Sequence, residues 1–161
     1  MILIALGASI PSRVGMPAQT LHAAIAEFER AGVRASAVSS FYETQAWPEP
    51  RDPAFVNAVA SIETSLAPVA LLAILHQIER DFGRVRSPRN APRTLDLDIV
   101  DYDGRIEGGP PTLPHPRIES RGFVLIPLRD VAPAWRHPVS HRSVAELIAA
   151  LPDESRAARR L

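Results

Sequence analysis

The chain has 161 residues, of which 46% are hydrophobic and 22% charged, and its formal net charge at pH 7 is zero. These values exclude a disordered chain and a globally basic nucleic-acid-binding protein, and the length suits one domain over residues 1–161. The chain has no cysteine, which excludes disulfides, thiolate metal sites and a cysteine nucleophile. No segment approaches the roughly 18 apolar residues that cross a membrane, and residues 1–13 lack the basic flank of a signal peptide. We therefore expect a cytoplasmic protein without a membrane or nucleic-acid partner, and a monomer by default.

The first part of the chain predicts a strand, a helix and a second extended segment. Residues 2–7 are a short apolar run closed by glycine, which is typical of a buried strand. A helix is expected from Pro17, because proline suits a first helical turn and apolar residues then recur at spacings of four and three. Gly32 is placed to end this helix, and residues 34–44 are again strand-like.

Residues 54–64 alternate in a way that gives one strand two different faces. The face expected in the core carries apolar side chains: Val56, Ala58, Ala60 and Ile62. The other face carries Phe55 and Asn57, and an amide beside an aromatic ring suits recognition of a flat heterocycle. An ordinary surface asparagine is an equally open interpretation of Asn57.

The remaining elements complete an α+β pattern. Pro68 opens a second helix that Gly83 is placed to end, and a further helix is expected around residues 120–129. Ser143 and Glu146 form a capping box at the start of a last helix. The order strand, helix, strand, strand, helix, strand, with a C-terminal extension, predicts a ferredoxin-like sandwich in which helices cover one face of a mainly antiparallel sheet.

Two aspartates separated by one leucine stand in a segment that reads as a strand, residues 94–100. Their side chains point to the open face, and their α-carbons lie about 6.5 to 7 Å apart. The alternate residues point to the core: Leu95, Leu97 and Ile99. Asp96 and Asp98 repel each other unless a cation joins them, and magnesium is the ready partner for oxygen ligands on a rigid strand. A solvated strand edge, where water screens the repulsion, is the alternative.

Arginines gather directly before these aspartates. Five of them fall within 14 residues: Arg80, Arg84, Arg86, Arg89 and Arg93. Arginine binds phosphate oxygens bidentately, and magnesium on carboxylates bridges the same oxygens, so the pattern favours a clamp for phosphoryl transfer. A flexible basic loop and an RNA-contact patch are the alternatives. The chain has no lysine and neither of the usual glycine-rich phosphate loops, so side chains and metal have to hold any phosphate.

Three further residues have weaker signals. His115 stands in a proline-stiffened loop, where it could donate to phosphate or serve only as a turn residue. Trp47 precedes a proline-rich stretch and is either part of a mobile lid or a buried anchor. His76, three residues before Glu79 on the second helix, is interpreted as part of a solvated helix face.

Six segments together carry a family resemblance. They are SSFYET (39–44), FVNAV (55–59), SLAPVALL (65–72), IERDFGRVR (78–86), PRTLDLDIV (92–100) and LPHPRIESRGFVLIPL (113–128). Residues 1–135 resemble the 6-hydroxymethyl-7,8-dihydropterin pyrophosphokinase family of folate biosynthesis. The resemblance implies transfer of the β,γ-diphosphate of ATP to the pterin's hydroxymethyl group, giving AMP and the pterin diphosphate, with two magnesium ions.

The resemblance also implies roles for single residues. The implied catalytic residues are Arg84, Arg93, Asp96 and Asp98, and the two aspartates are the implied magnesium ligands. The implied ATP site contains Glu79, Arg84, Arg86, Arg93, Ile99, Thr112, His115 and Arg121. The implied pterin site contains Thr44, Trp47, Phe55, Asn57, Asp96 and Phe123.

The chain departs from the family pattern at a few positions. The first strand ends in GAS at residues 7–9 where the family usually has GSN. Asn90 or Ala91 stands where the family often has an aromatic residue before the PRTLD motif, and Phe55 replaces a stacking tyrosine. In the ATP loop, Pro110 and Pro116 replace residues that the family often has there. Two other functions stay open: a magnesium-dependent transferase with another hydroxyl acceptor, and a ferredoxin-like RNA-binding module. The zero net charge and the aspartate pair argue against the second.

Overall fold

The computed structural model describes residues 1–46, 49–85 and 91–161. The strands are β1 (Ile2–Ala8), β2 (Arg34–Val38), β3 (Tyr42–Thr44), β4 (Phe55–Glu63), β5 (Asp96–Tyr102) and β6 (Arg159–Arg160). The helices are α1 (Pro17–Arg30), α2 (Pro68–Asp81), α3 (Gly122–Val131), α4 (Val144–Ala149) and α5 (Asp153–Arg156), with a 3-10 turn at Ile118–Ser120. Four residues of interest lie outside the described ranges: Trp47, Arg86, Arg89 and Asn90.

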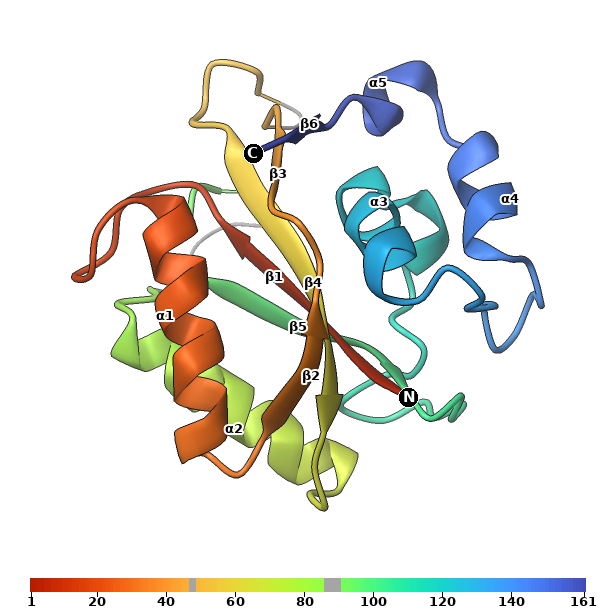
Figure 1. The fold of residues 1–161 in the computed structure, drawn as a ribbon, viewed down its shortest axis with the longest axis horizontal. Coiled ribbons are helices and arrows are strands. Elements are labelled where there is room, and N and C mark those ends of the chain that lie inside the picture. Colours follow the sequence, from red (N-terminus) through yellow and green to blue (C-terminus); the bar gives the residue numbers. More distant parts are fainter. Residues whose placement is uncertain (47–48, 86–90) are drawn as a thin grey trace.

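An antiparallel sheet forms the centre of the fold, with β1 in its interior (Figure 1). The strand order is β5-β1-β4-β3-β6, and β2 also pairs with β4. The prediction of a ferredoxin-like α+β fold is confirmed. The strand-like segment 34–44 is two strands rather than one, and the pairing of β6 with β3 near the C-terminus was not expected from the sequence.

The two predicted long helices begin and end where the sequence indicates. Pro17 and Pro68 occupy their first turns, where a missing backbone N–H costs nothing. Gly32 and Gly83 follow their last turns with φ of 75° and 82°, a left-handed conformation that glycine adopts without strain. The predictions for both helices are confirmed.

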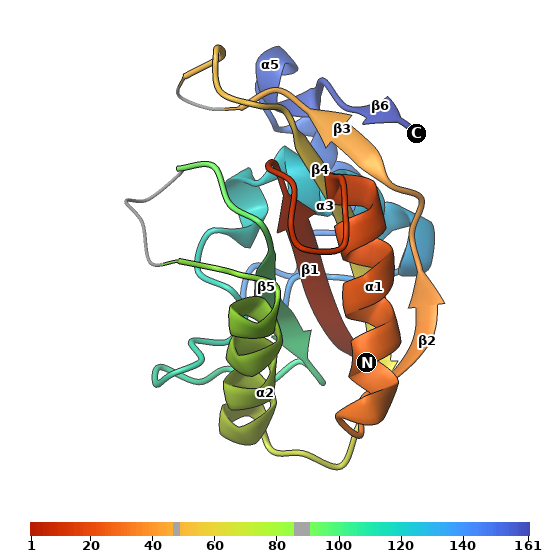
Figure 2. The same cartoon turned by 90° about the vertical axis from the view of Figure 1, so that its left-hand side faces the viewer.

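The first core lies between the sheet and the pair α1 and α2, which run side by side over one face (Figure 2). Leu21 and Phe28 of α1 and Leu75 of α2 are fully buried there. Leu97 and Ile99 of β5 point into the same core, as the alternation predicted. The two aspartates of β5 therefore belong to the opposite face of the sheet.

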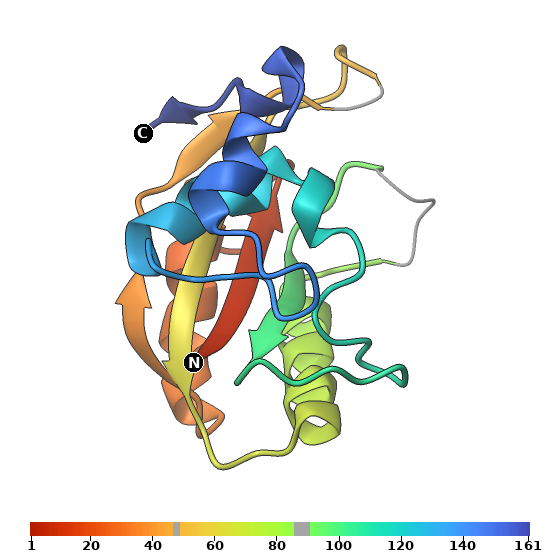
Figure 3. The ribbon, with the colours of Figure 1, turned by 90° about the vertical axis from the view of Figure 1, so that its right-hand side faces the viewer.

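Helices also cover part of that opposite face, which corrects the expectation of one covered face. Figure 3 shows α3 and α4 packed in front of it. A second core forms there from Leu3, Ala5, Val59 and Val100 of the sheet and from apolar residues of the helices. The reason is visible in β1, whose seven residues are all buried, since a strand that is apolar on both faces needs cover on both.

Four strand ends meet at one end of the sheet. Because β4 and β5 run antiparallel to β1, and β3 runs antiparallel to β4, the last residues of β1 and β3 lie beside the first residues of β4 and β5. Figure 2 shows the connections after β1 and before β5 at this end. No helix in the described ranges is long and apolar enough to cross a membrane.

Candidate active site

Three residues in register form the floor of the site. Gly7 of β1 pairs with Asn57 of β4 on one side and with Asp96 of β5 on the other. A Cβ atom at Gly7 would lie 3.2 Å from Asn57 Oδ1 and 4.0 Å from Asp96 Cβ. The missing side chain at Gly7 therefore leaves open space between the amide and the carboxylate.

A cavity of about 140 Å³ opens above this floor. It occupies the part of the second face that α3 and α4 leave uncovered. The sheet and its adjoining segments supply Ala5, Leu6, Gly7, Thr44, Gln45, Phe55, Asn57, Arg93, Asp96 and Asp98. The start of α3 and the residue before it supply Arg121, Phe123 and Val124. Apolar rings, an amide and charged groups thus face one space.

Asp96 lies between two guanidinium groups. Arg84 Nη1 donates to Asp96 Oδ1 at 2.9 Å and to the Leu95 carbonyl at 2.8 Å. Arg93 Nη1 donates to Asp96 Oδ2 at 2.8 Å, and its Nε donates to the Ala91 carbonyl at 3.1 Å. The side chains of both arginines are mostly buried, with exposed fractions of 20% and 15%. The carboxylate and its two cations are thus held in fixed positions.

Asp98 has a separate set of partners. Arg121 Nη1 donates to Asp98 Oδ2 at 3.0 Å, and His115 Nε2 lies 3.8 Å from the same oxygen. His115 Nδ1 accepts from the backbone N–H of Arg117, which leaves the ring proton on Nε2 in the neutral form, facing Asp98. Burial lowers the pKa of His115 from its usual value, and the Arg121 charge adds to this. A neutral donor at this place is therefore favoured over a cation.

The Asn57 amide is held in one orientation. Its Nδ2 donates to Thr44 Oγ1 at 2.9 Å, and the residue is only 4% exposed. The carbonyl oxygen Oδ1 then faces the open space above Gly7 as an acceptor. Phe55 and Phe123, from β4 and α3, place aromatic rings in the same cavity. This combination of rings and a fixed amide suits a flat heterocycle with N–H groups on its edge.

Glu79 lies behind β5 rather than in the cavity. It is 9% exposed, and its Oε1 accepts from the backbone N–H of Leu97 at 2.8 Å. β5 is an edge strand, so this side chain satisfies a backbone donor that has no strand partner. Burial, together with the charges of Asp96 and Asp98, raises the pKa of Glu79 to about 7, against the lowering effects of that hydrogen bond and of the Arg84 charge.

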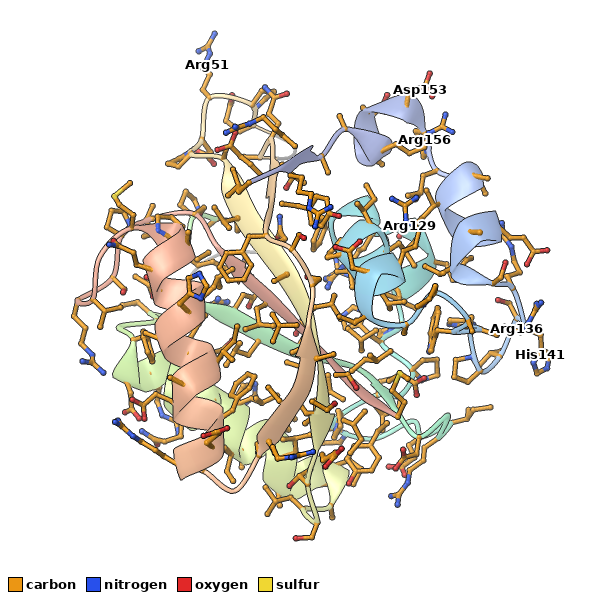
Figure 4. The ribbon with its side chains drawn as sticks, viewed as in Figure 1. Arg51, Arg129, Arg136, His141, Asp153 and Arg156 are labelled. Carbon is orange, nitrogen blue, oxygen red and sulfur yellow. The ribbon has the colours of Figure 1, made fainter. Side chains whose placement is uncertain are left out.

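Three arginines of the described ranges point away from the site. Figure 4 shows Arg51, Arg136 and Arg156 at the rim of the molecule, and Arg156 is paired with Asp153 of its own helix. These three arginines are therefore not part of the group of guanidinium side chains at Asp96 and Asp98.

Among the described residues, no group of three or more histidine, aspartate or glutamate side chains converges on one point. A metal at this site has two carboxylates available from the chain, Asp96 and Asp98. Magnesium fits such a donor set, because it is usually bound by one or two carboxylates and completes its shell with water and substrate phosphates.

Comparison with known proteins agrees with this chemistry. Residues 3–133 match the model of the 7,8-dihydro-6-hydroxymethylpterin-pyrophosphokinase family. The chain belongs to this family. Members of the pyrophosphokinase family are enzymes of folate biosynthesis and take ATP as co-substrate. The resemblance inferred from the six sequence segments is thereby confirmed.

Curated relatives support the assignment over most of the chain. A Pseudomonas aeruginosa protein named 2-amino-4-hydroxy-6-hydroxymethyldihydropteridine pyrophosphokinase is 41% identical over 155 residues, which cover 95% of this chain and 93% of that protein. A Synechocystis protein of the same name is 39% identical over 137 residues, covering 84% of this chain and 70% of the relative. A folic acid synthesis protein of Schizosaccharomyces pombe is 34% identical over 148 residues, covering 91% of this chain but 20% of that protein.

The structure brings most of the predicted site residues of this pyrophosphokinase family member together. One cavity is lined by Thr44, Phe55, Asn57, Arg93, Asp96, Asp98, Arg121 and Phe123. Arg84 and His115 adjoin it through the two aspartates. Thr112 is exposed, and Ile99 is 3% exposed in the core under α1 and α2, so Ile99 has only its backbone available to a ligand. Trp47 and Arg86 lie outside the described residues.

Gly7, Gln45 and Val124 line the cavity although the sequence did not indicate them as site residues. Gly7 had a usable signal, because it closes the apolar run of the first strand and opens the GAS segment, where the chain departs from the family pattern. Gln45 and Val124 had none, because only the packing of α3 and of the segment after β3 brings them here.

Proposed function

We propose that the protein transfers the β,γ-diphosphate of ATP to the hydroxymethyl group of 6-hydroxymethyl-7,8-dihydropterin. The hydroxymethyl oxygen forms a bond to the β-phosphorus, the bond from that phosphorus to the oxygen bridging to the α-phosphate breaks, and AMP leaves. The hydroxyl proton is released, and the product is the pterin diphosphate. The observation that carries the proposal is the cavity in which Asn57, Asp96 and Asp98 share one face of the sheet.

The pterin is proposed to lie between Phe55 and Phe123 above Gly7. Asn57 Oδ1, which faces this space, accepts from an N–H of the pterin edge, and Thr44 keeps the amide in that orientation. Trp47 stays a proposed pterin contact by family resemblance. Because the amide is buried, a ligand without a matching donor would leave its oxygen unpaired, which gives selectivity for the pterin edge.

Asp96 and Asp98 are the proposed ligands of two magnesium ions. Bound there, the ions supply charge neutralisation on the phosphate oxygens and a fixed orientation for the two substrates. The aspartates hold their positions through β5, which is paired with β1 along its length. Both carboxylates accept from arginines, so guanidinium groups that bind phosphate well already stand beside the proposed metal ligands.

The arginines are proposed to hold the triphosphate. Three guanidinium groups, those of Arg84, Arg93 and Arg121, contact the two carboxylates, so the site carries an excess of fixed positive charge. Arg84 and Arg93 neutralise charge on the transferring group, and His115 donates from Nε2. The proposed ATP contacts from family resemblance also include Glu79, Arg86, Ile99 and Thr112, of which Glu79 is more simply explained as the cap of the β5 edge.

The test is a reaction with ATP, magnesium chloride and the reduced pterin, followed by mass spectrometry of the products. AMP together with a pterin carrying two phosphates is the expected result. ADP with a singly phosphorylated pterin would overturn diphosphate transfer, and unchanged substrates would overturn the activity itself. Replacing the pterin with other primary alcohols tests the alternative of a transferase with another acceptor.

We also propose that residues 1–161 form a single domain, and that the protein is a cytoplasmic monomer that binds no nucleic acid. Light scattering after size-exclusion chromatography measures the mass in solution. A dimer mass would contradict the monomer.

A further inference from the structure

Ser9 connects the end of β1 to Arg93 through reciprocal hydrogen bonds. The backbone N–H of Ser9 donates to the Arg93 carbonyl at 2.9 Å. In return, the backbone N–H of Arg93 donates to Ser9 Oγ at 3.1 Å. The two residues are 84 positions apart in the sequence, so the contact exists only in the folded chain.

The hydroxyl is the part of this contact that depends on the residue type. Any residue except proline at position 9 would supply the backbone N–H, and Ile10 N–H also approaches the Arg93 carbonyl at 3.3 Å. The backbone N–H of Arg93, however, donates to the side-chain oxygen of Ser9, and among the described residues it has no other acceptor. Ser9 is 4% exposed, so water has little access to replace it.

The backbone of Arg93 determines where its guanidinium group lies. Its side chain is 15% exposed, with Nε on the Ala91 carbonyl and Nη1 on Asp96. These contacts and the Ser9 contact hold the side chain at both ends. A backbone shift at Arg93 would move the guanidinium relative to Asp96, and displacements near 1 Å cost about 100-fold in rate where geometry is critical.

We infer that Ser9 is a positioning residue for diphosphate transfer, which acts by holding the backbone of Arg93. The inference rests on the proposed role of Arg93 in neutralising charge on the transferring group. The contact links the central strand β1 to Arg93, which precedes β5. It also gives Ser9, the third residue of the GAS segment, a function that its sequence position does not suggest.

The test compares Ser9→Ala with wild type under saturating ATP and pterin. We expect kcat to fall about tenfold while both KM values change less than about twofold, because Ser9 is not among the residues that line the cavity. Ser39→Ala is the matched control. Ser39 is 7% exposed and its Oγ also accepts from a backbone N–H, that of Val59 at 3.0 Å, away from Arg93. Its kcat should stay within about twofold of wild type.

A double-mutant cycle decides whether Ser9 acts through Arg93. If it does, Ser9→Ala causes no further loss of kcat in an Arg93→Ala background. Two losses that multiply would overturn the inference, as would an unchanged kcat in the single variant. Ser9→Cys fills the site with a somewhat larger sulfur, which is only a weak acceptor, so it tests the same loss of the hydrogen bond if Ser9→Ala fails to fold.

The outcomes separate this inference from the proposed function. An impaired Arg93→Ala with a normal Ser9→Ala overturns the positioning role alone. A normal kcat in Arg93→Ala overturns the proposed role of Arg93, and the inference about Ser9 falls with it.

Discussion

At the scale of single residues, Asp96 and Asp98 differ from two solvated carboxylates because each is paired with buried arginine. Their mutual repulsion is therefore already offset in the folded protein. From the sequence alone, replacing one aspartate by a neutral residue would be expected to stabilise the protein by relieving this repulsion. The structure removes that expectation, because the loss of either charge leaves its arginine partners without an anion.

Asp96→Asn and Asp98→Asn should each lower kcat by orders of magnitude, because an amide is a poor replacement for a carboxylate that binds magnesium. Stability should change little or fall slightly, which thermal unfolding measures. Glu63→Gln, which removes an exposed partner of Arg34 at the far end of β4, is the control. Wild-type turnover in either aspartate variant would refute metal ligation.

Asn57→Ala tests the assignment of the pterin pocket. Loss of a buried hydrogen bond costs about 1 to 3 kcal/mol, roughly a factor of 5 to 150 in affinity. Pterin binding should weaken by an amount in this range, while a magnesium-bound, non-hydrolysable ATP analogue should bind nearly as before. Calorimetry with each ligand separately makes the measurement. If the nucleotide is affected equally, Asn57 does not belong to a separate pterin subsite.

At the scale of elements, the site depends on how α3 is held against the rest of the C-terminal segment. A Cβ atom at Gly122, the first residue of α3, would lie 1.7 Å from the backbone oxygen of Ser155 in α5. The neighbours of Gly122 in the chain are Arg121 and Phe123, both of which line the cavity. The close packing of α5 against the start of α3 thus helps to position Arg121 and Phe123 in the wall of the cavity.

Gly122→Ala distinguishes this close approach from helix propensity. Propensity alone would stabilise the protein by at most about 1 kcal/mol, whereas overpacking against a backbone atom costs about 1 to 3 kcal/mol. We expect the clash to dominate and the free energy of unfolding to fall in urea denaturation. Gly109→Ala, where a Cβ would meet no atom within 4 Å, is the control. A stabilised Gly122→Ala would mean that α5 moves away without cost.

At the scale of the whole molecule, the buried Glu79 makes stability depend on pH. Its pKa of about 7 lies above the ordinary value of 4.5, so the folded state binds more protons than the unfolded state between these values. The free energy of unfolding therefore falls as the pH rises from about 4.5 to 7. Below and above this range, Glu79 adds no pH dependence.

Glu79→Gln should remove that dependence while keeping an oxygen that accepts from Leu97 N–H. At pH 8 the variant should be more stable than wild type by up to about 3 kcal/mol, and at pH 4 the two should be equal. Urea unfolding without nucleotide or metal measures both. Glu29→Gln, an exposed change on α1, is the control. A gain of equal size at both pH values would show that ionisation of Glu79 is not the cause.

The sequence by itself determined the two long helices α1 and α2, most strands and the family. Proline and glycine at the ends of α1 and α2 limit the backbone locally, and alternation in β4 and β5 assigns each side chain to a face, so these features need no tertiary information. Asn57, Asp96 and Asp98 were indicated on this basis. Six segments together carried the family resemblance, and PRTLDLDIV is the one that contains both aspartates.

Only the tertiary structure decided how the two faces of the sheet are used and which residues touch. The cover by α3 and α4, the space above Gly7, the pairing of Asp96 with two arginines and the bond from Arg93 to Ser9 all join residues from separate elements. Such contacts depend on packing distances of a few tenths of an ångström across the sheet, and no local pattern of residue types encodes those distances.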